Sequence, residues 1–258
     1  MPIHATAIVD AQAEIDASAE IGPYCILGAE VHIGARTRLM ANNFFEGPTW
    51  VGEDNIFFPY STVGVASQDL KYKGERAETR IGHRNRIREF VTIHRGTQGG
   101  GLLTSIGSDN LLMAYCHVAH DVTIGDHVIM ANGATLAGHV TVGDWADLSA
   151  FIGVHQFCRV GRHAFVGPHS VVVQDVLPYS TTVGKRDVGV FGANRVGLQR
   201  RGFSTETIEA LQTTFRLLTR AKLNTTQAID RIRAEVPACA EVDELIEFIG
   251  SSERGVVK

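Results

Sequence analysis

An apolar residue returns at every sixth position over most of the chain. One run extends from Ile3 to Val63 and a second from Ile106 to Val172. Neither the 3.6-residue period of an α-helix nor the two-residue period of a half-buried strand produces this spacing. A small or β-branched residue, such as Cys25, follows four positions after each apolar one. Both positions are therefore expected to point into one narrow interior.

Six-residue units of this kind are the signature of a parallel β-helix. Three units make one triangular coil, so residues eighteen apart become neighbours on adjacent parallel strands, roughly 4.8 Å apart. We therefore predict an all-β solenoid of hexapeptide repeats over residues 1–190. Within it, spacing along the sequence predicts distance in space.

The repeat is interrupted twice, and we predict loops at 64–80 and 94–105. The first segment keeps the length of three hexads but has Asp69 and Glu75 where apolar residues belong. The second contains three consecutive glycines and shifts the register of the repeat. Since function in a solenoid often lies in its insertions, both loops are candidates for a functional site.

Residues 191–258 change to a helical period. Ser204 is placed to cap the first helix, and the apolar residues that follow it form a one-sided stripe. Two further helices are predicted around Ile232 and Leu245. We expect a small α-helical domain that covers the last coil, because an open sheet edge would invite strand addition.

Charge is distributed unevenly along the chain, whose formal net charge is −4. Between Lys185 and Lys222, eight basic residues face three acidic ones, which gives this segment a local charge of +5. The rest of the chain is acidic, so nucleic acid is not an expected partner. The phosphates of a nucleotide sugar or an acidic carrier protein fit the segment better.

The N-terminal residues contain no basic segment followed by an apolar run. We therefore expect neither secretion nor a membrane span, and a cytoplasmic location. Cys25, Cys116 and Cys158 fall on the small inward position of a hexad. There a free cysteine acts as a compact apolar residue, so we predict no disulfide among them.

Several of the eleven histidines form a pattern that the repeat does not explain. His139 lies nineteen residues after His120, so the two imidazoles should lie close together on one outer face. Asp121 is placed to hold an imidazole in one tautomer, as carboxylates do behind a catalytic base. The predicted cluster contains His94, His117, His120, His139 and His155.

Six strings in the chain resemble UDP-N-acetylglucosamine 3-O-acyltransferases, which catalyse the first step of lipid A biosynthesis. The resemblance covers nearly the whole chain, and its loop strings are more specific than the hexapeptide repeat. The strings are QDLKYKGE (68–75), IREFVTIHRGT (87–97), GSDNLLMAYCHVAHD (107–121), LAGHV (136–140), VHQFCRVG (154–161) and GLQRRGFS (197–204).

This resemblance implies a left-handed parallel β-helix and a homotrimer whose active sites lie in clefts between neighbouring prisms. It also implies that an (R)-3-hydroxyacyl group moves from an acyl carrier protein thioester to the 3-hydroxyl of UDP-N-acetylglucosamine. The 4′-phosphopantetheine arrives on the carrier, so no cofactor and no metal of the enzyme's own are expected.

The resemblance also assigns roles to individual residues. His120 corresponds to the general base, Asp121 to its orienting partner, and the backbone N–H of Gly138 to the donor that stabilises the thioester oxyanion. The residues implied to contact substrate are Gln68, Asp69, Lys71, His94, His117, His139, His155, Gln156, Asn194, Arg200 and Arg201.

Two residues depart from the family pattern. Val196 stands where the family often has an acidic residue. The sequence therefore does not establish the contact that this position would make with the nucleoside. Pro168 replaces the second glycine of a Gly-Gly pair near the position associated with the end of the bound acyl chain. We therefore predict that Pro168, with His169, limits acyl-chain length and favours a shorter chain.

Two alternatives come from other classes. An N-acyltransferase of the same solenoid superfamily would act on a 3-amino UDP-sugar, although such relatives usually carry an additional N-terminal domain. A zinc site like that of gamma-class carbonic anhydrases would use His94, His117 and either His120 or His139. The lysine and arginine content of the predicted site favours phosphate over a metal ion.

Overall fold

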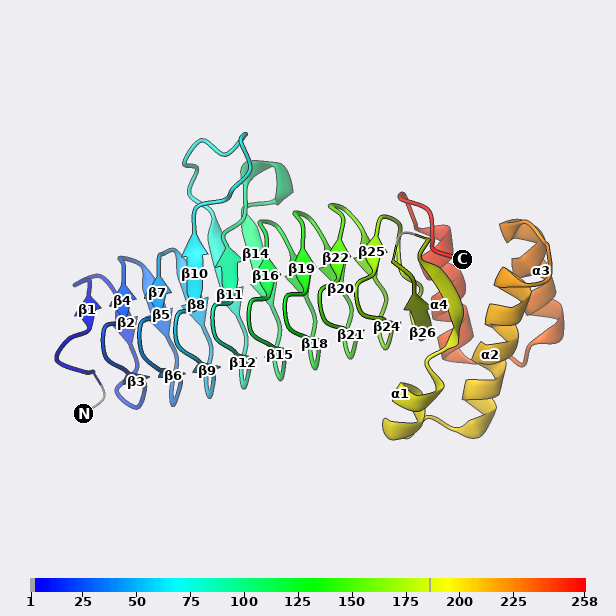
Figure 1. Cartoon of the computed structure of the whole chain (residues 1–258), viewed down its shortest axis with the longest axis horizontal. Helices are drawn as coiled ribbons and strands as arrows, with labels where there is room; N and C mark the ends of the chain where they lie inside the picture. Colours follow the sequence, from blue (N-terminus) through cyan, green and yellow to red (C-terminus); the bar gives the residue numbers. More distant parts are fainter. Residues whose placement is uncertain (1–2, 186) are drawn as a thin grey trace.

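Short strands alternate with tight turns along most of the chain and wind it into an elongated three-sided prism (Figure 1). The computed structural model describes residues 3–185 and 187–258. The strands form three sheets, one on each side of the prism, which we name A, B and C. Successive strands visit sheets B, C and A in turn, so three strands complete one coil.

All strands of sheets B and C run parallel. Sheet B consists of β1 (Ile8–Val9), β4 (Ile26–Leu27), β7 (Phe44–Phe45), β10 (Thr62–Val65), β13 (Thr92–His94), β16 (His117–Val118), β19 (Thr135–Leu136), β22 (Gly153–Val154) and β25 (Val171–Val172). Sheet C consists of β2 (Glu14–Ile15), β5 (Val31–Ile33), β8 (Thr49–Val51), β11 (Glu78–Ile81), β14 (Leu103–Ile106), β17 (Thr123–Ile124), β20 (Thr141–Val142) and β23 (Arg159–Val160).

Sheet A is parallel except for its last strand, which pairs antiparallel with its neighbour. It consists of β3 (Glu20–Ile21), β6 (Arg38–Leu39), β9 (Ile56–Phe57), β12 (Arg86–Ile87), β15 (Leu111–Leu112), β18 (Ile129–Met130), β21 (Asp147–Leu148), β24 (Phe165–Val166), β26 (Ser180–Val183) and β27 (Gly189–Ala193). The turns between sheets form three edges, which we name B/C, C/A and A/B after the sheets that they join.

The predicted stacking of residues eighteen apart is confirmed, for example by the pairing of Ile8 with Ile26. From Ile21 onward the apolar residue of each hexad is buried in the prism, whereas Ile3, at the N-terminal end, is 40% exposed. Cys25, Cys116 and Cys158 are also buried, and none of them forms a disulfide. Burial of this continuous column of aliphatic side chains is the main favourable term that holds the coils together.

The two predicted loops leave the prism at its B/C edge, where Figure 1 shows them side by side. Their strand-free segments are shorter than predicted, 66–77 and 95–102, because β10, β11, β13 and β14 extend into them. Both insertions shift the pairing, so that Thr62 lies beside Thr92, and Thr92 beside His117.

The C-terminal segment packs four helices at the end of the prism: α1 (Arg195–Arg200), α2 (Thr205–Thr219), α3 (Thr225–Glu235) and α4 (Ala240–Gly250). Ser204 caps α2 as predicted, accepting a hydrogen bond from the backbone N–H of Thr207. Helix α1 and the β26–β27 hairpin were not predicted. The predicted domain boundary at 190/191 falls inside β27, which continues sheet A.

None of the helices in the described part of the chain is long and apolar enough to cross a membrane.

Candidate active site at the B/C edge

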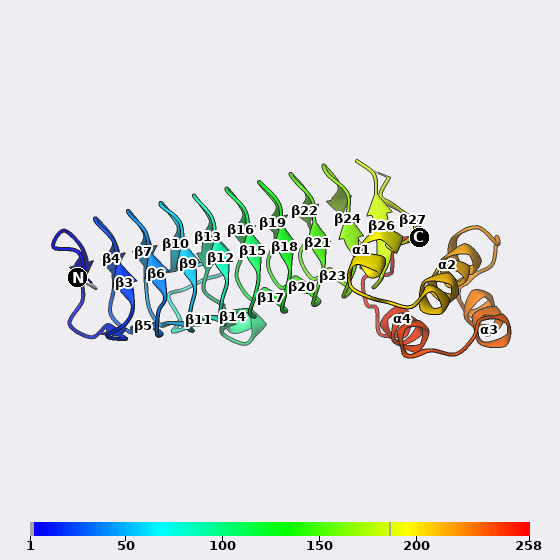
Figure 2. The same cartoon turned by 90° about the horizontal axis from the view of Figure 1, so that it is seen from below.

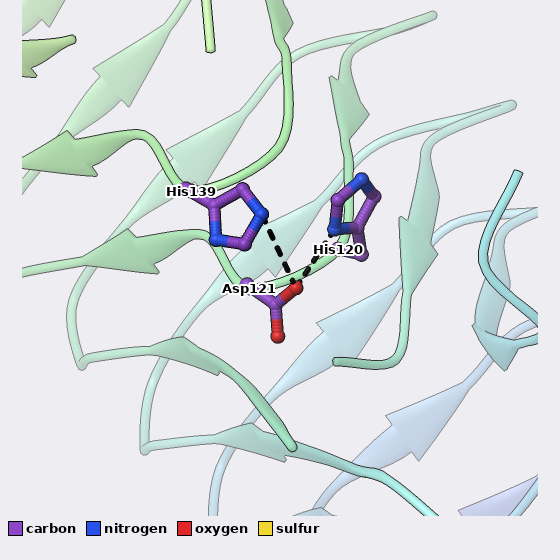
Figure 3. A group of neighbouring side chains, drawn as sticks. All are labelled: His120, Asp121 and His139. Atoms are coloured by element: carbon purple, nitrogen blue, oxygen red, sulfur yellow. Dashed lines mark hydrogen bonds and ion pairs between the residues drawn. The ribbon is translucent and has the colours of Figure 1, made fainter. Parts of the chain in front are cut away.

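His120 and Asp121 occupy a tight turn of the B/C edge, directly after β16 (Figure 3). Nδ1 of His120 lies 2.8 Å from Oδ2 of Asp121. A carboxylate can only accept, so this contact places the imidazole proton on Nδ1 and leaves the Nε2 lone pair free. Nε2 has no hydrogen-bond partner among residues 3–185 and 187–258. His120 is thus held in the tautomer that a general base requires.

Asp121 is itself fixed by the loop at 95–102. The backbone N–H of Thr97 donates to Oδ1 at 2.7 Å, and the hydroxyl of Thr97 donates to Oδ2 at 2.6 Å. Gly100 packs so closely that a Cβ at this position would overlap the carboxylate. Only 1% of the Asp121 side chain is exposed. The glycine-containing loop, predicted from the sequence as a candidate for a functional site, therefore holds the carboxylate in place behind His120.

Gly138 lies one coil beyond His120 on the same edge. A Cβ at residue 138 would overlap the imidazole of His120. Only a glycine at residue 138 therefore leaves room for the His120 ring where it lies. In the described part of the chain, no hydrogen bond uses the backbone N–H of Gly138, whereas its carbonyl accepts from the N–H of Phe157. An unpaired N–H beside a basic imidazole is a suitable donor for a developing oxyanion.

His139 stands next to this pair, as the eighteen-residue rule predicted. Its ring meets that of His120 edge to face, with 5.1 Å between centroids, and stacks on Phe157 at 4.3 Å. Burial lowers the pKa of His139, against the opposite effect of the Asp121 carboxylate. His139 is therefore neutral near pH 7 and able to hydrogen-bond a substrate oxygen.

His94 and His117 lie on sheet B, beside His120. Their rings meet edge to face with centroids 5.0 Å apart, and Nδ1 of His117 lies 2.7 Å from the hydroxyl of Thr92. Burial, reinforced by the neighbouring imidazoles, lowers the pKa of His94 to about 4. Burial likewise lowers the pKa of His117. Both are neutral hydrogen-bonding groups at physiological pH.

The next coil contributes two more predicted residues. Gln156 occupies the same turn position as His120 and Gly138, so the three residues line the B/C edge in consecutive coils. His155 follows β22 and is exposed, with Nδ1 3.2 Å from an Arg254 guanidinium nitrogen. No contact in the described residues joins His155 to His120.

The first loop supplies Gln68, Asp69 and Lys71, which are exposed or half-exposed. The charges of Asp69 and Lys71 act on the pKa of His139, which places both near the histidines. The side chain between them, Leu70, is fully exposed. The two loops are joined by the Glu75 carboxylate, which accepts from the backbone N–H of Gln98.

The donor atoms of His120, Asp121 and His139 lie within 4.8 Å of one another, close enough for a metal ion. The zinc ligands considered from the sequence were His94, His117 and either His120 or His139. The cluster in the structure instead contains both His120 and His139 together with the Asp121 carboxylate. Both oxygens of that carboxylate already accept hydrogen bonds from Thr97 or His120. The arrangement suits a carboxylate–histidine pair better than an open metal site.

The predicted residues Asn194, Arg200 and Arg201 lie elsewhere, around a pocket of about 860 Å³ on sheet A. Figure 2 shows α1 beside the end of this sheet. The guanidinium of Arg201 lies 5.1 Å from the centroid of Trp145. Burial lowers the pKa of Arg201 and raises that of Asp147, and each charge partly offsets the shift of the other. The pocket itself combines arginines with the aromatic rings of Phe165 and Phe191.

Asn194 has a structural role in this pocket. Its side-chain oxygen accepts from the backbone N–H of Gly197 and so caps α1, while its NH₂ group donates to the carbonyl of His163. Asn194 is 7% exposed. Its amide therefore fixes the position of α1, on which Arg200 lies, and its predicted substrate contact stays a prediction. Val196 is exposed at the rim.

Pro168 and His169 form a third group, on the A/B edge, where both are exposed and the ring of His169 stacks on Phe151. The predicted site is therefore divided among two edges and one face. In a three-sided prism the B/C edge lies opposite sheet A. One chain cannot present His120 and the sheet A pocket to the same small molecule.

The most informative residue that the sequence analysis missed is Thr97. Its hydrogen bonds to Asp121 cross from one coil to the next, but the insertion interrupts the hexad register there. The eighteen-residue rule therefore could not place the two residues side by side. The only available signal was the short string GTQGGG itself, whose glycines permit close packing.

A parallel β-helix that presents an aspartate-oriented histidine at one edge and a basic pocket on another face defines a hexapeptide-repeat transferase. Family comparisons agree with this class. Residues 103–138 match the bacterial transferase hexapeptide family, and residues 175–257 match domain 2 of UDP-N-acetylglucosamine O-acyltransferase.

Full-length relatives identify the family. The chain is 48% identical to an acyl-(acyl-carrier-protein)–UDP-N-acetylglucosamine O-acyltransferase of Thermodesulfovibrio yellowstonii and 44% identical to one of Herminiimonas arsenicoxydans, with 99% of each chain covered. The structure of LpxA from Acinetobacter baumannii superimposes with a TM-score of 0.96 at 42% identity over 100% of both chains. That of the Bacteroides fragilis UDP-N-acetylglucosamine acyltransferase gives 0.97 at 38% identity, over 99% of this chain and 100% of the other.

The chain therefore belongs to the UDP-N-acetylglucosamine O-acyltransferase family and is an acyltransferase. The predicted fold, a left-handed parallel β-helix of hexapeptide repeats with a small C-terminal helical domain, is confirmed by the same structures.

Proposed function

We propose that this chain transfers an (R)-3-hydroxyacyl group from an acyl carrier protein thioester to the 3-hydroxyl of UDP-N-acetylglucosamine, the first step of lipid A biosynthesis. The observation that supports this most directly is the free Nε2 of His120, with its tautomer fixed by Asp121 and the unpaired N–H of Gly138 one coil away. These are the base and the oxyanion donor that acyl transfer from a thioester requires.

In the proposed reaction, Nε2 of His120 removes the proton from the sugar hydroxyl as its oxygen attacks the thioester carbonyl carbon. The N–H of Gly138 stabilises the oxyanion that forms on the carbonyl oxygen. The C–S bond then breaks, the oxyanion collapses to the ester, and protonated His120 returns its proton to the leaving thiolate. Because the thioester stores the driving force, no metal ion or nucleotide hydrolysis is needed.

The divided site leads us to propose that the active form is a homotrimer. If sheet B of one chain faces sheet A of the next, then His120 of the first chain lies across a cleft from Arg200 and Arg201 of the second. The sugar diphosphate would bind the arginines while its 3-hydroxyl reaches His120. This arrangement gives the sheet A pocket, at about 860 Å³, a role in catalysis.

The surface of sheet B supports an acyl-binding role. Next to the histidines, sheet B carries the small, partly exposed residues Ala137 and Gly153, with the exposed Thr135 between His117 and Gly153. A side chain at Gly153 would meet no neighbouring atom, so its absence leaves open space. Beyond Gly153, Val171 and Val173 are half-exposed and apolar. A hydrocarbon chain crossing sheet B from His120 would reach the A/B edge at Pro168.

The carrier protein is the remaining proposed partner. Arg216 and Arg220 line a smaller pocket next to the first, and together with Arg195 they extend the basic surface. An acidic carrier would be steered to such a surface. The cytoplasmic location expected from the N-terminal residues and the absence of a cofactor expected from the family resemblance stay predictions.

The decisive experiment is a product assay with purified protein, a panel of 3-hydroxyacyl carrier protein thioesters of different lengths, and both UDP-N-acetylglucosamine and its 3-amino analogue. Mass spectrometry should detect an O-acylated product from the first sugar. A product formed only from the amino sugar would favour the N-acyltransferase instead. Loss of activity on chelation, with recovery on adding zinc, would replace the histidine-base mechanism by a metal-dependent one.

A further inference from the structure

The sheet A pocket contains one acidic side chain among its arginines. Asp147 lies on β21, in register with Phe165 of the next strand, and both residues line the pocket. Asp147 is the single acid among the lining residues in the described part of the chain. The cationic lining residues are Arg195, Arg200, Arg201 and Arg220. A carboxylate here repels the diphosphate that the arginines are proposed to bind, so its presence in this pocket needs a separate reason.

The carboxylate of Asp147 has no hydrogen-bonding partner within the chain. In residues 3–185 and 187–258 it accepts no hydrogen bond and forms no close ion pair. The side chain is half-buried, and this burial raises the pKa of Asp147, while the charges of Arg201 and Arg200 oppose the shift and favour the ionised form. An ionised carboxylate only accepts hydrogen bonds. Its oxygens are therefore available to a donor on a ligand in the pocket.

A sugar nucleotide offers three kinds of donor to this acceptor. The hydroxyls of the N-acetylglucosamine belong to the end of the molecule that must reach His120. The N3–H of uracil lies between two carbonyl oxygens, which a carboxylate repels. The ribose 2′- and 3′-hydroxyls are adjacent donors that one carboxylate can bind together, as an acidic residue binds ribose in dinucleotide folds. The ribose is therefore the part of the ligand that suits Asp147 best.

We propose that Asp147 accepts hydrogen bonds from the ribose hydroxyls of the sugar nucleotide and so makes the pocket selective for a ribonucleotide. This proposal rests on the proposed function, which places the diphosphate on Arg200 and Arg201. Helix α1, which lines the same pocket, contains these arginines' neighbour Val196 but no acid. Asp147, on the sheet, is thus the carboxylate that the pocket provides.

The test compares equilibrium binding of UDP with that of 2′,3′-dideoxy-UDP, which keeps the base and phosphates but lacks both hydroxyls. The wild type should bind UDP at least about tenfold more tightly, as expected for hydrogen bonds to a charged acceptor. Asp147→Asn should bind UDP about tenfold more weakly than the wild type does. The same variant should bind dideoxy-UDP as tightly or more tightly, because a charge that repels phosphate is removed.

The matched control is Glu20→Gln, which neutralises an exposed carboxylate on β3, a distant strand of the same sheet, and should keep both wild-type affinities. A wild type that binds the two nucleotides equally, or binds neither, would overturn the proposal without any variant. An Asp147→Asn variant that binds both nucleotides more tightly would show that Asp147 only repels phosphate. A variant that binds both equally more weakly would show a structural role, and either result would overturn the proposal.

These binding measurements use no acyl donor, so they separate this proposal from the proposed function. Ribose selectivity that depends on Asp147, in a protein that transfers no acyl group, would refute the proposed function and leave the role of Asp147 in place. Acyl transfer by a protein without ribose selectivity would support the proposed function and overturn the role of Asp147.

Discussion

Thr97 and Asp121 lie twenty-four residues apart in the sequence and are joined by two hydrogen bonds, from the backbone N–H and the hydroxyl of Thr97 to the two carboxylate oxygens. Asp121 in turn accepts from Nδ1 of His120. The loop that carries Thr97 therefore acts through the carboxylate on His120, the proposed base. In the proposed reaction Thr97 is a positioning residue, since it touches no reacting atom.

We expect Thr97→Val to lower kcat by about tenfold, because loss of one hydrogen bond to a buried carboxylate costs roughly 1.5–3 kcal/mol and loosens the orientation of His120. KM for the sugar nucleotide should change little. Thr97→Ser keeps the hydroxyl and is the matched control, which should retain near-normal kcat. Equal kcat in the Val and Ser variants would show that the hydroxyl does not support catalysis.

His120→Ala should leave a folded assembly and remove nearly all acyl transfer, with a loss of at least ~10²-fold in kcat, as expected for a positioned base. The side chain of His120 is 13% exposed at a turn, so its removal opens no cavity in the prism core. Steady-state kinetics and thermal unfolding measure the two effects separately. Near-normal turnover would exclude His120 as the base.

Arg200→Glu should raise KM for the sugar nucleotide more than tenfold at low salt and much less at high salt, because exposed charges are screened by ions. Arg200 is exposed on α1 at the rim of the sheet A pocket. Arg231→Glu, at an exposed position of α3, is the matched control. KM values that do not depend on salt would argue against a phosphate contact at Arg200.

The stability of the folded chain should fall as pH decreases from 7 to 5. Burial lowers the pKa of His163 to about 4, well below the 6.5 of an unperturbed histidine. Between these values the unfolded chain binds the proton and the folded chain does not, so acid favours unfolding. The loss from this group is about 2 kcal/mol over this range. His94, with a pKa of about 4, acts in the same direction.

Thermal unfolding at several pH values tests this effect. His163→Phe should flatten the acid side of the profile, because the ring that stacks near Trp145 and Tyr179 is kept while the titrating group is lost. His4→Phe changes an exposed histidine and should keep the wild-type profile. Identical pH profiles for the wild type and His163→Phe would contradict the assignment.

The hexad period predicted much of the fold because each coil repeats the same contacts. It correctly placed His139 beside His120, since both lie in uninterrupted hexads. It did not predict helix α1, whose cap is a hydrogen bond from Gly197 to Asn194, nor the β26–β27 hairpin, where the hexads stop. Such features depend on contacts outside the repeat.

The candidate site was predicted less completely for the same reason. Residue types indicated a base and a phosphate-binding group, but not that they lie on opposite sides of one prism. The face on which Arg200 lies is set by the position of α1 against sheet A, a tertiary contact that the spacing rule does not cover.

Pro168→Gly should shift the preferred donor to a longer 3-hydroxyacyl chain and leave the response to UDP-sugar concentration unchanged. Pro168 is exposed on the A/B edge, where a chain crossing sheet B from His120 would end. Each additional buried CH₂ contributes about 0.8 kcal/mol, or roughly a fourfold preference per methylene. Competition between thioesters of different length, with products resolved by mass, measures this preference directly.

The competing possibility is that Pro168 only rigidifies its turn and that Phe165 or His169 ends the groove. His169→Ala is the matched variant, because its ring stacks on Phe151 beside the same turn. If Pro168 ends the groove, His169→Ala should keep the original chain-length profile. A Pro168→Gly variant that unfolds at a lower temperature but keeps that profile would show that Pro168 stabilises the turn and does not measure the acyl chain.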